Sequence, residues 1–337
     1  MSYRILRCSC YVKRALCIRL NTPKSKRNMF VHKKNNSNYK IASFFSLSIS
    51  LFGFGLKDDE TPEDKLTNTI KRAIMSINNQ QYEKAEQILH LALRMAQDLQ
   101  SRDGITYVYD VMANLALERE QYEKAEKLFS EVMKRLLEEG YQEDNLKVIH
   151  ISLKLANIAH HLGKVEKSML GFNWTLPKIE KRAESNPDDV EIKEIFGLAK
   201  YWFGQLLIKT NEYEKARLQL ISAYECFIEI YGFKNTESIT ILNDLSVACA
   251  KLNRLSEAKS YILTAIRLAK VSDDYQQEAI LQINLGLILL QEGLLNDAKL
   301  HCSQAWRLSK ETKDYSAVRQ AEICLNQIKI HEVKLEK

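Results

Sequence analysis

Small, apolar and polar residues recur along this chain at intervals of about 40 residues. The run QYEKAE begins at Gln81 and returns unchanged at Gln121. When the alanine of this run serves as the reference, equivalent positions continue through the sequence at spacings of 40 to 48 residues, which indicates an internal repeat. The reference positions are Ala85, Ala125, Ser168, Ala216, Ala258 and Ala298.

Two further sets of residues follow the same repeat, and the first of them played no part in the alignment. Small residues stand twelve positions before each reference residue: Ala73, Ala113, Ala156, Gly204, Ser246 and Gly286. Aromatic or aliphatic residues stand three positions before it: Tyr82, Tyr122, Val165, Tyr213, Leu255 and Leu295. A small residue on one helix lets a second helix approach closely. Each unit is therefore predicted to be a pair of antiparallel helices with the larger residue at the turn.

This layout resembles the tetratricopeptide repeat, whose usual period is about 34 residues; the longer units here are similar to the long-helix variety of kinesin light chains. We predict an all-α fold: a right-handed α-solenoid of about six long hairpins over residues 62–312, then a capping helix and tail over residues 313–337. The chain has only 4 prolines and 11 glycines, as long helices require. Helix ends are predicted near Gly104, Gly140, Gly163, Gly232 and Gly293 and at residues 186–189.

The first 57 residues differ in charge from the rest of the chain. They hold twelve lysines and arginines and no acidic residue before Asp58. A basic, amphipathic, acid-free N-terminus resembles a mitochondrial transit peptide, which we assign to residues 1–40; the alternative is a cytosolic basic tail. Residues 41–57 form a short, apolar, membrane-proximal segment, with 16 uncharged residues from Ile41 to Leu56. A membrane span needs about 20 residues, so the segment either stays at the membrane or is removed with the presequence.

The net charge of +6 hides a mildly acidic folded part, because 37 basic and 43 acidic residues follow residue 57. This balance argues against nucleic acid as a partner. Cys226, Cys249, Cys302 and Cys324 are far apart and form no C-x-x-C pair, so we expect buried core cysteines and neither a zinc site nor a disulfide framework.

The sequence contains none of the local motifs that would indicate an enzyme. The adjacent His160 and His161 point about 100° apart on a helix, which does not make a metal-binding face. No phosphate-binding glycine loop and no nucleophile elbow occurs in the chain. We predict no catalytic residue, no metal site, no cofactor and no enzymatic activity.

The first helix of every unit lines the concave face of a helical-repeat stack, where such proteins hold peptides or protein partners. The predicted partner-binding positions are Tyr107, Asp110, Asn114, His150, Asn157, His160, Tyr201, Gln205 and Asn243. Asn114 and Asn157 are equivalent in the repeat, and either amide can pair with an extended backbone; the alternative is a solvent-facing polar residue. Chaperone-binding repeats carry a lysine four residues before such an asparagine, where this chain has Asp110 and Leu153, which disfavours that function.

Several segments resemble a particular family. TNTIKRAI (67–74), ITYVYDVMANLALERE (105–120), QEDNLKVIHISLKLA (142–156) and SLFGFGL (50–56) are similar to the mitochondrial tetratricopeptide repeat domain protein nineteen family. The resemblance implies a non-enzymatic assembly and maintenance factor of respiratory complex III, the ubiquinol–cytochrome c reductase. Its partners would be complex III subunits including the Rieske protein, whose maturation and fragment clearance it would support.

The same resemblance implies association with the inner mitochondrial membrane, on a face that the residues leave undecided. The first alternative is a cytosolic adaptor like a kinesin light chain, although the heptad coiled coil of such adaptors is missing. A hydrolase is the second alternative, and the absence of a nucleophile or metal motif disfavours it.

Overall fold

The computed structural model describes residues 61–232, 235 and 237–335, which form thirteen α-helices and no strand. The predicted all-α helical-repeat fold is confirmed. The helices are α1 (Pro62–Asn78), α2 (Tyr82–Asp98), α3 (Arg102–Glu118), α4 (Tyr122–Glu138), α5 (Leu146–His161), α6 (Val165–Ser185), α7 (Val190–Lys209), α8 (Tyr213–Tyr231), α9 (Glu237–Lys251), α10 (Leu255–Val271), α11 (Tyr275–Gln291), α12 (Leu295–Glu311) and α13 (Tyr315–Leu335).

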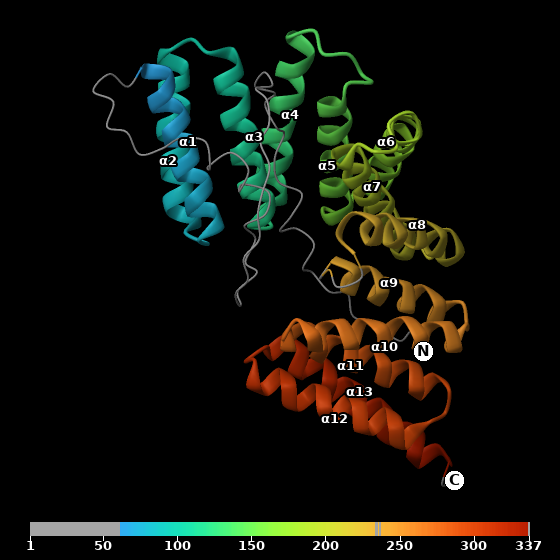
Figure 1. Cartoon of the computed structure of the whole chain (residues 1–337). Coiled ribbons are helices and arrows are strands. Elements are labelled where there is room, and N and C mark those ends of the chain that lie inside the picture. Colours follow the sequence, from blue (N-terminus) through green and yellow to red (C-terminus); the bar gives the residue numbers. More distant parts are fainter. Residues whose placement is uncertain (1–60, 233–234, 236, 336–337) are drawn as a thin grey trace, which may run out of the picture. The chain divides into compact units, whose positions relative to one another are not determined.

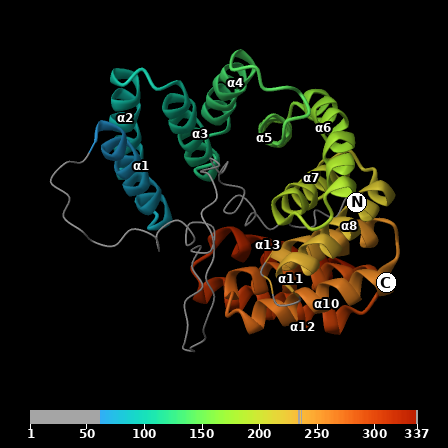
Figure 2. The ribbon, with the colours of Figure 1, turned by 45° about the horizontal axis from the view of Figure 1, so that its top comes forward.

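The described helices fall into two compact units (Figures 1 and 2). The N-terminal unit holds α1 to α5, in which each helix packs against the next one and α1 also touches α3. The C-terminal unit holds α6 to α13, again packed in chain order. In this second unit the alternate helices α7, α9 and α11 are also in contact, and α13 packs against both α11 and α12. Within each unit, first helices of neighbouring repeats therefore meet directly.

The second helix of each hairpin begins at the larger residue that the repeat places in the turn. Tyr82, Tyr122, Val165, Tyr213, Leu255 and Leu295 are the first residues of α2, α4, α6, α8, α10 and α12. Just before these helices the chain passes through a left-handed backbone conformation, with φ of 75° at Gly163 and 57° at Glu120. Gly104 lies near a helix end, as predicted, but not in the left-handed conformation of a glycine cap: it is in the first turn of α3, where its N–H donates to Ser101 Oγ over 3.1 Å.

The predicted break at residues 186–189 separates α6 from α7. Asp189 is the N-cap of α7, and its carboxylate accepts hydrogen bonds from the backbone N–H of Glu191 at 2.9 Å and of Ile192 at 3.1 Å. These bonds satisfy two of the amide groups that the first turn of a helix leaves without a partner. The longest spacing of the repeat is accommodated here, between a 21-residue α6 and a 20-residue α7.

The small repeat residues lie in the core between helices. The reference residues are completely buried, and the first-helix positions Ala73, Ala113, Ala156 and Ser246 are at most 3% exposed. A Cβ atom added to Gly204 would lie 2.8 Å from the Leu220 side chain, and one added to Gly286 would lie 2.4 Å from Cys302 Sγ. Paired helices thus approach at distances that larger residues would prevent.

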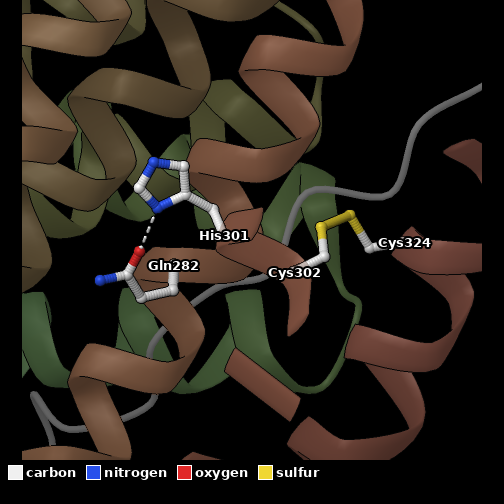
Figure 3. The surroundings of a disulfide bond; sticks show 4 residues. All are labelled: Gln282, His301, Cys302 and Cys324. Carbon is white, nitrogen blue, oxygen red and sulfur yellow. Dashed lines mark hydrogen bonds between the residues drawn. A yellow bond between two sulfur atoms is a disulfide. The ribbon is translucent and has the colours of Figure 1, made fainter. Parts of the chain in front are cut away.

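The expectation that the cysteines would form no disulfide is wrong for one pair. Cys302 of α12 and Cys324 of α13 are bonded, with their Cα atoms 6.2 Å apart (Figure 3). Sequence spacing concealed this pair because the two cysteines, 22 positions apart, are separated by the turn between α12 and α13, which brings the two antiparallel helices together. Cys226 and Cys249 are free and buried, as expected, and burial raises the pKa of each thiol to about 11.

No helix in the described part of the chain combines the length and apolar character that a bilayer crossing requires. The predicted transit peptide (1–40) and apolar segment (41–57) lie outside the described residues.

Candidate protein-binding surface

The predicted partner-binding positions lie on the first helices of four repeats, and most of them are buried. Tyr107 and Gln205 are partly exposed, whereas the other seven are at most 7% exposed. The solvent-facing alternative is therefore wrong for Asn114 and Asn157. Contact with a partner at these positions stays a prediction.

In the N-terminal unit a buried lysine joins two neighbouring first helices. Lys154 of α5 is completely buried, and its Nζ donates to Asn114 Oδ1 of α3 over 2.9 Å. The ammonium group also lies 5.1 Å from the centroid of the Phe129 ring, a distance typical of a cation–π contact. Asn114 Nδ2 in turn donates to the Asp110 carbonyl over 2.8 Å. The amide oxygen and the aromatic face both stabilise the buried ammonium group.

Two buried groups on α5 have hydrogen-bonding capacity that the described residues leave unused. His150 Nε2 and Asn157 Oδ1 have no hydrogen-bond partner in this part of the structure. Burial, together with the charge of Lys154, holds the pKa of His150 well below its ordinary value of 6.5, so the imidazole is neutral at pH 7. His160 packs edge-on to His161, with ring centroids 5.3 Å apart. No cluster of three or more metal-binding side chains occurs among the described residues.

In the C-terminal unit the three predicted positions belong to one hydrogen-bond network. Gln205 Nε2 donates to Tyr201 Oη over 2.7 Å and to Asp244 Oδ2 over 3.0 Å, and Tyr201 Oη donates to the same carboxylate oxygen over 3.3 Å. Asn243 Nδ2 approaches Asp244 Oδ1 at 3.4 Å, and Asn284 Nδ2 donates to Asn243 Oδ1 over 2.7 Å. The network runs from α7 through α9 to α11.

We refer to Asn114–Lys154, Gln205–Asp244 and Asn243–Asn284 as the inter-repeat polar pairs. Their partners are separated by 40, 39 and 41 residues. Lys154, Asp244 and Asn284, which the sequence analysis missed, each stand two residues before the small first-helix residue of their repeat. A polar residue inside an otherwise apolar stretch at this position was the signal that could have revealed them.

The duplicated QYEKAE run also joins neighbouring repeats. Glu86 of the first copy bonds to Lys124 of the second copy and to Arg119 Nη1, the latter over 2.7 Å. This bonding with Lys124 lowers the pKa of Glu86 below its ordinary value. Tyr82 Oη donates to Glu118 Oε1 over 2.9 Å, and burial with this carboxylate raises the pKa of Tyr82 to about 12. Glu86 therefore links two neighbouring repeats, although its side chain stays partly exposed.

A pocket opens beside two of the predicted positions, Tyr107 and Asp110. Its volume is about 440 Å³, including the part that is open to solvent. It lies between α3, the end of α4 and the start of α5. The lining residues are Asp103, Thr106, Tyr107, Asp110, Val132, Leu136, Glu139, Tyr141 and Lys147. Thr106 Oγ1 donates to Glu139 Oε1 over 3.1 Å, and Lys147 Nζ donates to Tyr141 Oη over 3.3 Å.

In each hairpin of about 40 residues the two helices meet at small residues, and polar pairs join the first helices of neighbouring hairpins. These features define a helical-repeat protein of the tetratricopeptide type. No protein-family model matches the chain. The chain is 51% identical over 284 residues to the mitochondrial tetratricopeptide repeat protein 19 homolog of Drosophila melanogaster, covering 84% of this chain and 77% of that protein. It is 30% identical over 267 residues to tetratricopeptide repeat protein 19, mitochondrial, of Homo sapiens, covering 76% and 70%. The chain belongs to the mitochondrial tetratricopeptide repeat protein 19 family.

Two solved structures illustrate the similarity of fold. The apo form of RapI has a TM-score of 0.56 at 15% identity, covering 80% of this chain and 99% of that one. NprR in complex with its cognate peptide NprX has a TM-score of 0.53 at 13% identity, covering 83% and 75%. At such low identities the likeness concerns the fold alone, and this fold class is typical of proteins that bind other proteins.

Proposed function

We propose that this protein is a non-enzymatic maintenance factor of respiratory complex III, which it binds through its helical-repeat surface. In this role it supports maturation of the Rieske iron–sulfur subunit and clearance of that subunit's proteolytic fragments. The observation that carries the proposal is membership of the mitochondrial tetratricopeptide repeat protein 19 family, at 51% identity to the Drosophila melanogaster protein. The sequence resemblance that first suggested the family implies this role.

The chemistry of the first helices supports the binding of an extended polypeptide. Asn157 Oδ1 and a ring nitrogen of neutral His150 are buried in the unbound chain, and they offer unused hydrogen-bonding capacity to a backbone that displaces the side chains covering them. A buried polar group gains most from a partner that replaces its lost water. NprR, which shares the fold, is described in complex with a peptide. A surface for extended segments suits a factor that handles subunit fragments.

The protein is proposed to act at the inner mitochondrial membrane. Support comes from the basic, acid-free residues 1–40 and the apolar run from Ile41 to Leu56, together with the mitochondrial names of its relatives. Mass spectrometry of the mature N-terminus shows whether residues 41–56 are retained. Protease protection in mitoplasts then identifies the face of the membrane on which the repeat domain lies.

The binding proposal is tested with a single substitution on α5. Asn157→Leu keeps the side-chain size but removes the amide, so a tagged variant should co-purify less complex III from mitochondria than the wild type does. In cells lacking the protein, the variant should also fail to clear Rieske fragments. Asn296→Leu changes an exposed asparagine of α12 and serves as the matched control, with circular dichroism to verify folding. Unchanged co-purification and unchanged clearance by a folded Asn157→Leu protein would reject the proposal.

The non-enzymatic part of the proposal has its own test. Purified protein incubated with purified Rieske subunit should leave that subunit intact. Fragment production by the purified wild-type chain would show that the protein cleaves its partner itself.

A further inference from the structure

The pocket beside Tyr107 carries an excess of negative charge. The carboxylates of Asp103 and Glu139 line it, against the single ammonium group of Lys147. Asp103 is exposed and Glu139 is half-buried. Asp110 also lines the pocket but is engaged with other residues, so its charge is not counted. The bond from Thr106 Oγ1 holds Glu139 in place at 3.1 Å. An entering cation therefore meets one carboxylate at the rim and a second one farther in, whereas an anion is repelled.

The remaining walls of the pocket are apolar and aromatic. Val132 and Leu136 of α4 are buried, and Tyr107 and Tyr141 contribute their rings. Lysine and arginine side chains combine a hydrocarbon stem, which packs on apolar surface, with a charged end. One wall already holds such a group, because Lys147 Nζ lies 5.0 Å from the centroid of the Tyr141 ring, within the range of a cation–π contact.

The geometry favours a long organic cation over a metal ion. The described residues contain no group of three or more acidic, histidine or cysteine side chains arranged to hold a metal. Asp103 is exposed at the rim and Glu139 is half-buried, so the two carboxylates lie at different depths. His150 lies one helical turn after Lys147 and is buried, which keeps its imidazole neutral at pH 7, so it does not offset the negative charge.

We propose that this pocket receives a lysine or arginine side chain of the polypeptide segment that the protein binds. The inference rests on the proposed function, because it specifies the chemistry of the bound segment. It predicts that partner segments carry at least one basic residue whose side chain enters between α3 and α4.

The test uses matched pairs of short synthetic peptides and the protein as purified from mitochondria. One member of each pair carries arginine or lysine, and the other carries citrulline or norleucine, which keep the length but remove the charge. A hydrogen-bonded charge is worth enough for about tenfold tighter binding of the charged member. In the double variant Asp103→Asn, Glu139→Gln this preference should fall to less than about twofold. Glu138→Gln changes the neighbouring residue of α4, 64% exposed and outside the pocket, and should retain the preference.

The possible outcomes separate the two proposals. Equal binding of charged and neutral peptides by the wild type would overturn the pocket assignment and leave polypeptide binding intact. A preference that survives in the folded double variant, as judged by circular dichroism, would also overturn the pocket. Failure of every peptide to bind would overturn both the pocket and the extended-segment mode of binding.

Discussion

Gly286 lies where α11 passes the Cys302–Cys324 disulfide, and a single methyl group should be costly there. The Cβ atom of an alanine would lie 2.4 Å from Cys302 Sγ, 3.2 Å from the Ala298 carbonyl oxygen and 3.4 Å from Cys324 Sγ. Favourable non-bonded contacts lie at about 3.5–4.0 Å, so atoms must shift by roughly 1 Å at the closest point. Overpacking of this kind costs about 1–3 kcal/mol.

The higher helix propensity of alanine offsets part of this destabilisation. Replacing glycine with alanine in a helix interior contributes about 0.5–1 kcal/mol of stability. The net expectation for Gly286→Ala is a loss of about 1–2 kcal/mol, or a melting temperature lower by about 2–8 °C. Differential scanning calorimetry in non-reducing buffer measures this shift.

The disulfide determines the size of the effect, because a bonded sulfur cannot rotate away from the new methyl group. In a Cys324→Ser background Cys302 is free to change rotamer, so Gly286→Ala should cost less there than in the wild type. A Gly286→Ala protein that melts at or above the wild-type temperature would refute the packing argument. An equal cost in both backgrounds would refute the role of the disulfide.

Three further predictions concern turns, caps and ion pairs. Gly163→Ala should lower the free energy of unfolding, measured by urea denaturation, by about 1–2 kcal/mol. The backbone at this position has a φ of 75° and no atom lies within 4 Å of the new Cβ, so the cost comes from backbone strain and not from a clash. Gly163→Asn should lose less stability, because asparagine tolerates this conformation better. Asp189→Ala should lose about 1 kcal/mol by removing both cap hydrogen bonds, whereas Asp189→Asn should keep most of the stability, and equal losses would contradict the capping role. The folded-state pKa of Glu86 lies below its ordinary 4.5, so its ion pairing stabilises the fold above pH 4.5 and this stabilisation is lost as pH falls through the folded pKa. In thermal melts from neutral to acid pH, Glu86→Gln should therefore lose less melting temperature on acidification than the wild type does. Parallel plots of melting temperature against pH for the two proteins would contradict this.

The fold could be predicted from the sequence because its determinants recur locally. Small residues twelve positions apart specify where paired helices touch, and residues such as Tyr82 mark where each second helix begins. These signals lie within one hairpin and return in each repeat. A single exception, such as Gly104, which is not a left-handed cap, therefore does not obscure the pattern.

The polar contacts and the disulfide could not be predicted in the same way. Lys154 and Asn114 are 40 residues apart, and the sequence of neither helix indicates which side chain the residue will contact. A polar residue within an apolar stretch marks Lys154 as a candidate, but its choice of partner depends on how one repeat packs against the next. Cys302 and Cys324 meet only because α13 folds back on α12. The pocket beside Tyr107 likewise combines α3, the end of α4 and the start of α5.

The inter-repeat polar pairs restrict how the length of each hairpin can vary. One residue inserted inside a helix turns everything beyond it by about 100°, which would carry Lys154 or Asp244 away from its amide partner while leaving it in the apolar interior. A buried charge that loses its partner costs about 3–5 kcal/mol, far more than a loop change does. Additions and deletions in this protein are therefore tolerable at the surface turns and forbidden within the first helices, so electrostatics, as much as packing, keeps successive repeats in register.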